Sequence, residues 1–444
     1  MAEAFATSAF QTVSQLAAQP AVHQAFQWFH LQEPKLREWH RQVVAIPAPP
    51  FGEAVRAEWV AAQFTALGLE DVHIDPCGNA LGWLRGCAQD SSFDTPRRTT
   101  GPAVSPACTL FSAHLDTVFP ADAIGEPVQR DSVLLAPGAC DNCAGITALL
   151  AIAAAARAAK VRLATDVLFA GNVGEEGEGN LRGMRYLFTE SPFAGRIRSA
   201  VVLDGAGTET IVTHALGSKR FRVTVEGPGG HSWTDAGVPN PILVLANALS
   251  SLDRMELPTT PRSTWNAGHI EGGTSINAIP QHAQMRIDTR STDPQLLREL
   301  EEHIVRAVED AVDEANLRFE KNGGVKYADR SSHNLTNAMP VIYRMETIGE
   351  RPAARLEEAA AILANLRAVD RHLGIQSHSR TASTDANIPL SLGIEAVSIG
   401  CGGSGGGVHT REEWYDAHGR DLALRRILLL LLAVGQERLN LEKV

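Results

Sequence analysis

"ACTLFSAHLD", residues 107–116, is a short apolar run that ends in polar residues. A run of this length is typical of a strand that is buried on both faces. Three later segments repeat the form: "ATDVLFAGNVGEEG" (164–177), "SAVVLDGAG" (199–207) and "GIEAVSIGCGGSGGGVHT" (393–410). Between the first two, the Ala-rich residues 144–159 predict a helix. Apolar strands that alternate with helices predict an α/β fold with a mainly parallel sheet.

The middle of the chain has a different pattern. Residues 218–227 and 283–291 alternate apolar and polar side chains with a period of two, which predicts antiparallel strands with one solvated face. Residues 240–252 and 294–316 have the apolar spacing of amphipathic helices. These four elements predict a smaller α+β domain that is inserted into the α/β domain.

The domain boundaries follow from these two patterns. We expect the inserted domain at residues 213–329, and the α/β domain at residues 1–212 and 330–444. A chain of 444 residues is long enough to build a core for each domain.

Charge and apolar content disfavour several classes of function. The formal net charge of −11 disfavours nonspecific electrostatic binding to nucleic acid or to an anionic membrane. Residues 1–15 contain neither the basic nor the apolar segment of a secretory signal. The longest apolar run, 427–434, has eight residues, whereas a membrane-spanning helix needs about 20. We therefore expect a cytoplasmic protein with no nucleic-acid or membrane partner, and a buried helix at 427–434.

The polar residues near the strand ends are imidazoles and carboxylates. Ligands of α/β sheets gather outside the carboxyl ends of the strands. The candidates there are His114, Asp116, Asp141, Glu175, Glu176, Asp204 and His409. If one carboxylate bridges two zinc ions and each ion has three protein ligands, the site needs about this set of imidazoles and carboxylates. Each residue alone also fits an ordinary role, such as a hydrogen-bonded strand-end histidine, a solvated acidic turn or a loop histidine.

The segment "PGACDNCAG", residues 137–145, contains a Cys-x-x-Cys pair. Such a pair is typical of a redox dithiol or of half a zinc–thiolate site. The six cysteines of the chain are scattered, and no second pair completes a zinc–thiolate site. We therefore interpret Cys140 and Cys143 as packing residues and Asp141, between them, as the functional residue. A redox role remains the alternative.

In sequence order, the motifs resemble one enzyme family from about residue 38 to the end of the chain. The matching segments are "HLDTV", "PGACDNCAGITALL", "GEEGEGN", "VVLDGAG", "GPGGHSW", "GGTSINAIP", "DTR" and "GGGVHT". The chain resembles the co-catalytic-zinc metallopeptidases and amidohydrolases, the family of glutamate carboxypeptidase, peptidase T, aminoacylase and acetylornithine deacetylase. The resemblance implies a zinc-hydrolase catalytic domain that is interrupted by a lid domain, and the lid commonly forms a homodimer.

The resemblance implies two zinc ions per chain and a role for each ligand. Asp141 is similar to the carboxylate that bridges both ions, and the peptide bond after it is often cis in the family. His114 and Asp204 look like the other ligands of one ion. Glu176 and His409 look like those of the second. Cobalt or manganese could replace zinc in the cell.

The resemblance also implies catalytic and substrate contacts. Glu175 looks like the general base, and Asp116 would orient His114. His231, in the lid, is similar to the histidine that polarises the scissile carbonyl, often across the dimer. Asn277 and Arg290 fall at substrate-contact positions, and Arg290 could clamp a substrate carboxylate. The alternatives are a surface turn for His231 and an ordinary strand-face ion pair for Arg290.

The function that we expect is hydrolysis of the amide bond of short peptides by a di-zinc exopeptidase. A water between the two zinc ions would attack the carbonyl, and a glutamate would act as the general base. Asp204 favours a peptidase, because several deacylases of the family carry Glu at its position. An N-acyl-amino-acid amidohydrolase is the alternative. An inactive binding scaffold on the same fold is the alternative from another class.

Overall fold

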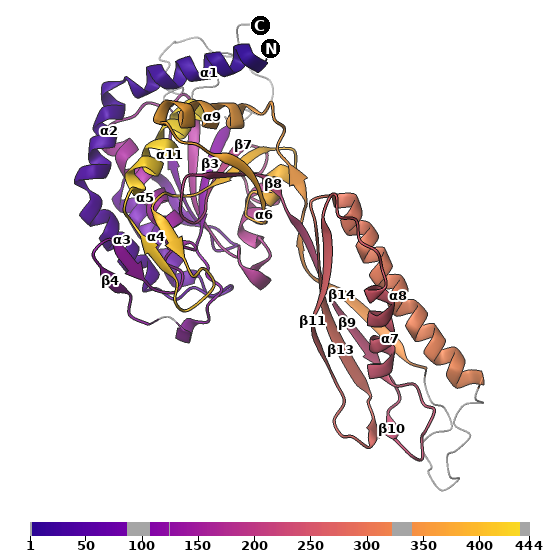
Figure 1. The fold of residues 1–444 in the computed structure, drawn as a ribbon. Coiled ribbons are helices and arrows are strands. Elements are labelled where there is room, and N and C mark those ends of the chain that lie inside the picture. Colours follow the sequence, from indigo (N-terminus) through magenta and orange to yellow (C-terminus); the bar gives the residue numbers. More distant parts are fainter. Residues whose placement is uncertain (1, 87–106, 124, 322–339, 436–444) are drawn as a thin grey trace, which may run out of the picture. The chain divides into compact units, whose positions relative to one another are not determined.

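The computed structural model describes residues 2–86, 107–123, 125–321 and 340–435 (Figure 1). These residues form two compact units. The first unit consists of Met1–Ala215 and Arg355–Val444, and the second consists of Leu216–Ala354.

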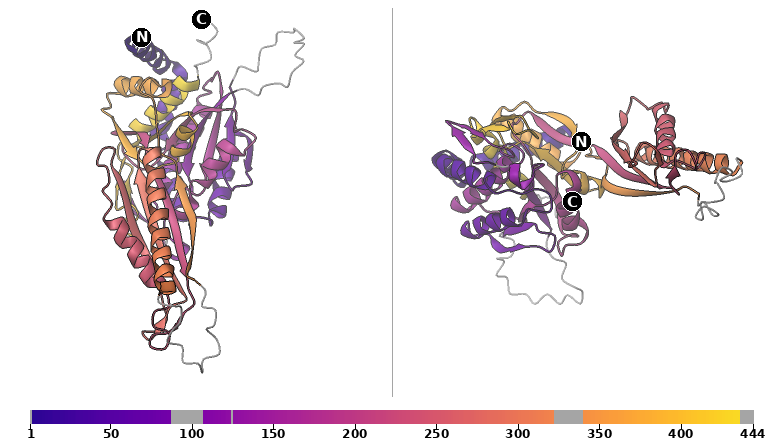
Figure 2. Two further views of the ribbon diagram at one scale, coloured as in Figure 1. Left: turned by 90° about the vertical axis from the view of Figure 1, so that its right-hand side faces the viewer. Right: turned by 90° about the horizontal axis from the view of Figure 1, so that it is seen from below.

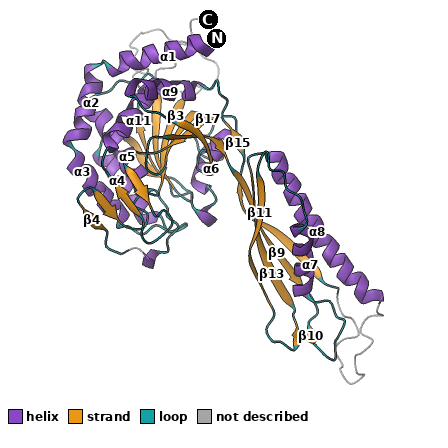
Figure 3. Cartoon of the chain, viewed as in Figure 1, coloured by secondary structure: helices purple, strands orange, loops and turns teal. Residues whose placement is uncertain are grey.

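A nine-stranded sheet of order β1-β2-β6-β3-β7-β17-β8-β15, with β16 paired to β8, forms the centre of the first unit (Figure 3). The strands are β1 (Glu70–Ile74), β2 (Ala80–Leu84), β3 (Cys108–His114), β6 (Asp166–Asn172), β7 (Ile197–Leu203), β8 (Thr210–Ala215), β15 (Ala354–Arg355), β16 (His378–Ala382) and β17 (Glu395–Ile399). The pairs β3–β6, β3–β7, β7–β17 and β8–β16 are parallel. The predicted mainly parallel α/β sheet is therefore confirmed.

The first unit also contains helices, some of which pack on the large sheet, and a smaller sheet. The helices are α1 (Ala2–Ala17), α2 (Pro20–Leu31), α3 (Glu33–Val44), α4 (Ala54–Ala66), α5 (Cys143–Ala158), α6 (Arg182–Thr189), α9 (Ala361–Leu373), α10 (Asn387–Ser391) and α11 (Arg420–Gly435), with short 3₁₀ turns η2 (Ala121–Ala123) and η3 (Gly177–Gly179). The smaller sheet has the order β18 (Ser404–Gly406), β19 (Trp414–Asp416), β5 (Val133–Leu135), β4 (Val128–Arg130).

Helix α5 packs closely against the sheet and fixes the loop before it. All its residues from Cys143 to Ala156 are buried, and it contacts β3 and β7. At Gly145 an added Cβ would lie 2.7 Å from the carbonyl oxygen of Leu203, the last residue of β7. Glycine therefore allows α5 to begin close to the carboxyl end of β7, where the candidate ligands gather.

The apolar run 427–434 lies in α11, and every residue from Arg426 to Gly435 of this helix is buried. The predicted buried helix is therefore confirmed. Within the described ranges, no helix has the length and apolarity needed to cross a membrane.

The second unit is a four-stranded antiparallel sheet with two helices on one face (Figures 1 and 2). The sheet has the order β11 (Ser263–Gly272), β13 (His282–Ser291), β9 (Gly217–Glu226), β14 (Ile342–Arg351). Helices α7 (Pro241–Asp253) and α8 (Pro294–Lys321) pack on it, and a core with Phe221, Val223, Met285, Leu245 and Ile304 lies between. A separate pair, β10 (Gly230–His231) and β12 (Ala278–Ile279), completes the unit.

The boundaries of the second unit differ from the predicted 213–329. The compact unit begins at Leu216 and ends at Ala354, because β14 pairs with β9 from Ile342↔Glu226 to Arg351↔Ser218. The prediction assigned this strand to the α/β domain. Local sequence pattern does not reveal which strand a segment pairs with, so it could not predict this domain boundary.

Candidate functional site

The parallel strands bring His114 and Asp204 to one edge of the large sheet. His114 is the last residue of β3, and Asp204 follows β7, the parallel neighbour of β3. Atom Nε2 of His114 lies 3.9 Å from Oδ1 of Asp204. Because adjacent parallel strands end at the same edge, two residues 90 positions apart become neighbours.

Asp141 lies between the two candidate imidazoles. Its Oδ1 is 3.0 Å from Nε2 of His114, and its Oδ2 is 3.2 Å from Nε2 of His409. The same His409 nitrogen is 3.1 Å from Oε1 of Glu176. The five candidate ligands thus form two groups that share Asp141. The Asp141–Asn142 peptide bond is cis, as the resemblance predicted.

The carboxylates favour positive charge on both imidazoles. Burial alone would lower the pKa of His114, but the neighbouring carboxylates of Asp116, Asp141 and Asp204 outweigh burial and raise that pKa well above its ordinary value. Hydrogen bonds to Asp141 and Glu176 raise the pKa of His409 to about 10. Burial would raise the pKa of Asp141, but the two imidazoles hold it below its usual range. The cluster therefore has the electrostatic character of a cation site.

The donor set fits divalent cations. Ligand atoms of His114, Asp141 and Glu176 all lie within 4.8 Å of one another. Two atoms that bind one zinc at about 2.1 Å in tetrahedral geometry are about 3.4 Å apart. The separations of 3.0 to 3.9 Å around Asp141 are close to that value. Imidazole nitrogens and carboxylate oxygens are also the ligand types that zinc, cobalt and manganese accept.

Asp116 contacts His114 through its main chain. Nδ1 of His114 bonds to the main-chain oxygen of Asp116 at 3.0 Å, whereas the nearest carboxylate oxygen is 3.7 Å away. The carboxylate instead accepts the main-chain N–H groups of Glu175 at 2.9 Å and Glu176 at 2.7 Å. Asp116 thus orients His114 through its backbone, and its side chain fixes the turn that carries both glutamates.

A further buried carboxylate, that of Asp385, lies close to this edge of the sheet. Asp385 accepts a 2.6 Å hydrogen bond from Nδ2 of Asn172, and Asn172 is directly opposite His114 in the β3–β6 register. Burial raises the pKa of Asp385 to about 7. Asn172 is the last residue of an apolar strand, and this position could have marked it as a candidate site residue. It is not among the candidates predicted from the sequence.

Glu413 is a further site residue that the sequence did not reveal. Its buried carboxylate accepts three main-chain N–H bonds at 2.8 Å, from Gly138, Cys140 and Asp141. It therefore holds the loop that presents the shared carboxylate. "REEW" looks like a solvated charge run in the sequence, and only the pairing of β19 with β5 turns Glu413 inward.

We expect Glu413→Gln to lower metal affinity or kcat by about 10- to 100-fold, the usual effect of losing a partner that orients a ligand. The amide offers one acceptor to three N–H donors, and its own N–H groups oppose them. Metal titration and steady-state kinetics measure the effect. Glu412→Gln, at the exposed neighbouring position, is the matched control and should change neither value. Equal behaviour of the two variants would contradict the orienting role.

Cys140 and Cys143 are free, buried thiols. Burial raises the pKa of Cys140 to about 12, and burial also raises the pKa of Cys143. A redox thiol needs an accessible, acidic sulfur, so the environment favours packing residues. Sγ of Cys140 fills the space that a side chain at Gly405 would need.

We expect iodoacetamide at pH 8 to label Cys140 and Cys143 only after denaturation, because neither thiol is exposed or acidic. Peptide mapping by mass spectrometry measures the labelling, with the partly exposed Cys77 as the internal control. Rapid labelling of native Cys140, or a Cys140–Cys143 disulfide after mild oxidation, would support the redox alternative.

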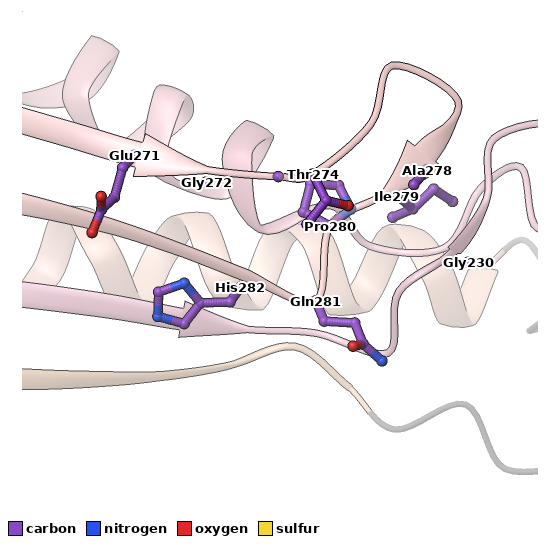
Figure 4. A pocket seen from close by; sticks show the side chains of 10 residues that line it. Gly230, Glu271, Gly272, Thr274, Ala278, Ile279, Pro280, Gln281 and His282 are labelled. Carbon is purple, nitrogen blue, oxygen red and sulfur yellow. The ribbon is translucent and has the colours of Figure 1, made fainter.

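His231 and Asn277 lie together at one end of the second unit. His231 pairs with Ala278 between β10 and β12, and the main-chain oxygen of Asn277 accepts the N–H of Ser232 at 3.0 Å. Nδ1 of His231 accepts the N–H of Trp233 at 3.2 Å. A pocket of about 860 Å³ adjoins them, lined by Gly230, Ala278 and neighbouring residues (Figure 4).

Arg290 lies in the four-stranded sheet, at the other end of the second unit. It is opposite Ser218 on β9 and pairs with Asp288 at 2.8 Å. His282, where β13 begins beside the pocket, is eight residues away. At about 3.4 Å per residue, about 27 Å of strand separate the two ends. Within this unit, the structure therefore does not bring Arg290 to His231 and Asn277.

Two family models match the chain. The peptidase dimerisation domain matches residues 213–316, and peptidase family M28 matches residues 98–224. A probable carboxypeptidase of Aspergillus oryzae is 27% identical over 201 residues, which cover 41% of this chain and 47% of the relative. The match thus spans about half the length of that relative. An uncharacterized Bacillus subtilis protein, YqjE, is 22% identical over 86% of this chain and 94% of its own.

Solved structures share the fold. A tripeptidase from Staphylococcus aureus has a TM-score of 0.68 at 20% identity, covering 91% of this chain and 98% of its own. Aminopeptidase PepT from Bacillus cereus has a TM-score of 0.67 at 18% identity, covering 90% and 98%. The fold of these structures and the two peptidase family models thus agree with the resemblance of the motifs to the zinc metallopeptidases and amidohydrolases.

Proposed function

We propose that the protein is a di-zinc exopeptidase that hydrolyses the amide bond of short peptides. The observation that carries the proposal is the position of Asp141, within 3.2 Å of both imidazole nitrogens. One carboxylate with a histidine on each side, and a further carboxylate beside each histidine, is the donor arrangement of two ions that share a ligand.

Five side chains would hold the ions. His114 and Asp204 would bind one, Glu176 and His409 the other, and Asp141 both. When bound, two divalent cations supply Lewis acidity, which polarises the amide carbonyl and activates water for attack.

Glu175 would act as the general base. It is 6% exposed, and its main-chain N–H donates a 2.9 Å hydrogen bond to Asp116, which fixes the turn that also carries the proposed ligand Glu176. It would accept a proton from the attacking water and deliver this proton to the leaving amine. Because both main-chain N–H groups are held by Asp116, the two neighbouring side chains keep different directions, one for the metal and one for the water.

His231 would stabilise the developing negative charge on the carbonyl oxygen. Because its Nδ1 accepts a hydrogen bond from Trp233, the neutral ring carries its proton on Nε2, which can donate to that oxygen. Arg290 would hold a substrate carboxylate. A tripeptide spans only about 10 Å, so it cannot reach both ends of β13. This supports a homodimer in which the partner subunit's His231 completes the site.

A hydrolysis screen tests the proposal. The panel contains di- and tripeptides, N-acetyl amino acids and folate-like glutamates. We expect turnover of peptides from one terminus, loss of activity on chelation, and recovery with two zinc ions per chain. Preferred hydrolysis of N-acetyl amino acids would identify an amidohydrolase instead. Tight metal binding without turnover of any substrate would support an inactive scaffold.

A further inference from the structure

One face of the second unit's sheet is rich in arginine. Side chains alternate between the two faces of a strand. Helices α7 and α8 cover one face of the sheet (Figures 1 and 2). Phe221 and Val223 of β9 and Met285 of β13 belong to the core on that face, so the even-numbered residues of both strands lie on the opposite face. The arginine face, as we call it, consists of Arg220, Arg222, Arg286, Arg290 and Arg344.

Carboxylates neutralise the arginine face only in part. Two acidic side chains, Asp288 and Glu346, lie among the five arginines, and each is shared by two of them. The ion pairs are Arg220–Asp288 (3.2 Å), Arg290–Asp288 (2.8 Å), Arg222–Glu346 (3.3 Å) and Arg344–Glu346 (2.6 Å). Glu271 lies in the same row across the sheet as Arg344, and Glu226 lies one row further along β9. Five arginines against these four carboxylates leave one positive charge in excess on the arginine face, in a chain whose net charge is −11.

Arg286 is the clearest sign of an absent anion. It lies directly opposite Arg222, and like charges in that position destabilise a sheet. Among the residues that the structure describes, Arg286 forms no ion pair, and its buried Nε has no hydrogen-bond partner. An uncompensated guanidinium beside a second one favours an anion that bridges them.

We propose that the arginine face binds an extended peptide with acidic side chains. Guanidinium groups bind carboxylates in a two-pronged geometry. Arg220 and Arg222, two residues apart on β9, are spaced by about 6.8 Å, and so are alternate side chains on one side of an extended peptide. The groups are also accessible, since 35% of the Arg222 side chain and 78% of the Arg344 side chain are exposed.

Nucleic acid fits the arginine face less well. Proteins that bind single strands combine positive charge with aromatic side chains on which bases stack. In the described strands, this face carries no Phe, Tyr or Trp: Trp265 packs against the core instead. The overall negative charge also opposes the approach of a long polyanion.

Fluorescence anisotropy with the metal-loaded enzyme tests the proposal. The probe is a fluorescein-labelled tetrapeptide of D-glutamate. The measurement detects binding and requires no hydrolysis of the probe, so the result is independent of the proposed activity. We expect a D-glutamine tetrapeptide to bind at least tenfold more weakly. Binding of the acidic probe should also weaken as salt rises from about 50 to about 300 mM, because salt screens exposed charges.

Substitutions locate the binding. Arg286→Gln and Arg344→Gln should each weaken binding about tenfold, and Arg286→Lys should lose less because it keeps the charge. Arg344 is so exposed that its substitution tests binding even if Arg286→Gln lowers stability. Arg306→Gln, at an exposed site on α8 with its own acidic neighbour Glu302, is the matched control. Equal effects at Arg306 and Arg344, equal affinity for D-glutamine, or tighter binding of a single-stranded oligonucleotide would overturn the proposal.

Discussion

The Glu175→Ala variant is expected to lower kcat by about 10²- to 10⁴-fold while the enzyme keeps its metal. Glu175 is not among the five candidate ligands, so its removal takes away proton transfer and leaves the donor set intact. Its main-chain N–H still bonds to Asp116 in the variant, and Glu176 therefore stays in place. Steady-state kinetics on the best peptide, together with metal analysis by mass spectrometry, measures both parts of the prediction.

Glu178→Ala is the matched control, because this glutamate lies three residues further along the same acidic segment and is exposed. It should retain wild-type kcat. Near-wild-type kcat in Glu175→Ala would show that another group acts as the base. Loss of metal from Glu175→Ala would instead make Glu175 a ligand.

The Asp141→Ala variant should lose both ions and all measurable turnover. Substituting a residue that merely orients a ligand weakens metal binding by 10- to 100-fold, so removing a ligand shared by two ions should weaken it by more than about 100-fold. The two imidazoles also lose the carboxylate that lies within 3.2 Å of each. Metal content after dialysis and kcat/KM are the measurements.

Substitutions on the two sides of Asp141 make the test specific. Asp204→Ala and Glu176→Ala should each remove mainly one ion, because each residue lies beside only one of the imidazoles. Asp122→Ala, at an exposed position in η2, should keep both ions. If Asp141→Ala retained one tightly bound ion, the shared-ligand arrangement would be wrong.

Several features could be predicted because they depend on local pattern. Apolar runs such as 107–116 and 199–207 predicted parallel strands, and His114 and Asp204 at their ends lie 3.9 Å apart. The buried α11 helix and the cis bond after Asp141 also agree with the predictions. The roles of the site residues remain predictions that the variants above test.

Other features depend on which segments pair. The predicted end of the inserted domain, residue 329, missed β14, because its partner β9 lies more than 100 residues earlier. Glu413 was missed because a carboxylate that accepts three main-chain bonds looks, in sequence, like a solvated one. That Asp116 meets His114 through its main-chain oxygen could not be read from the sequence, because side-chain and main-chain acceptors of one residue are indistinguishable there.

The sequence by itself determined the fold class and the set of candidate ligands, since strand periodicity and residue type need no knowledge of contacts. Only the tertiary structure decided that Asp141 lies between two imidazoles and that Glu413 holds its loop. It also decided that Arg286 lies opposite Arg222 while Arg290 and His231 lie at opposite ends of one unit. These relations depend on strand register and close packing, which distribute side chains in space according to partners that are distant in the chain.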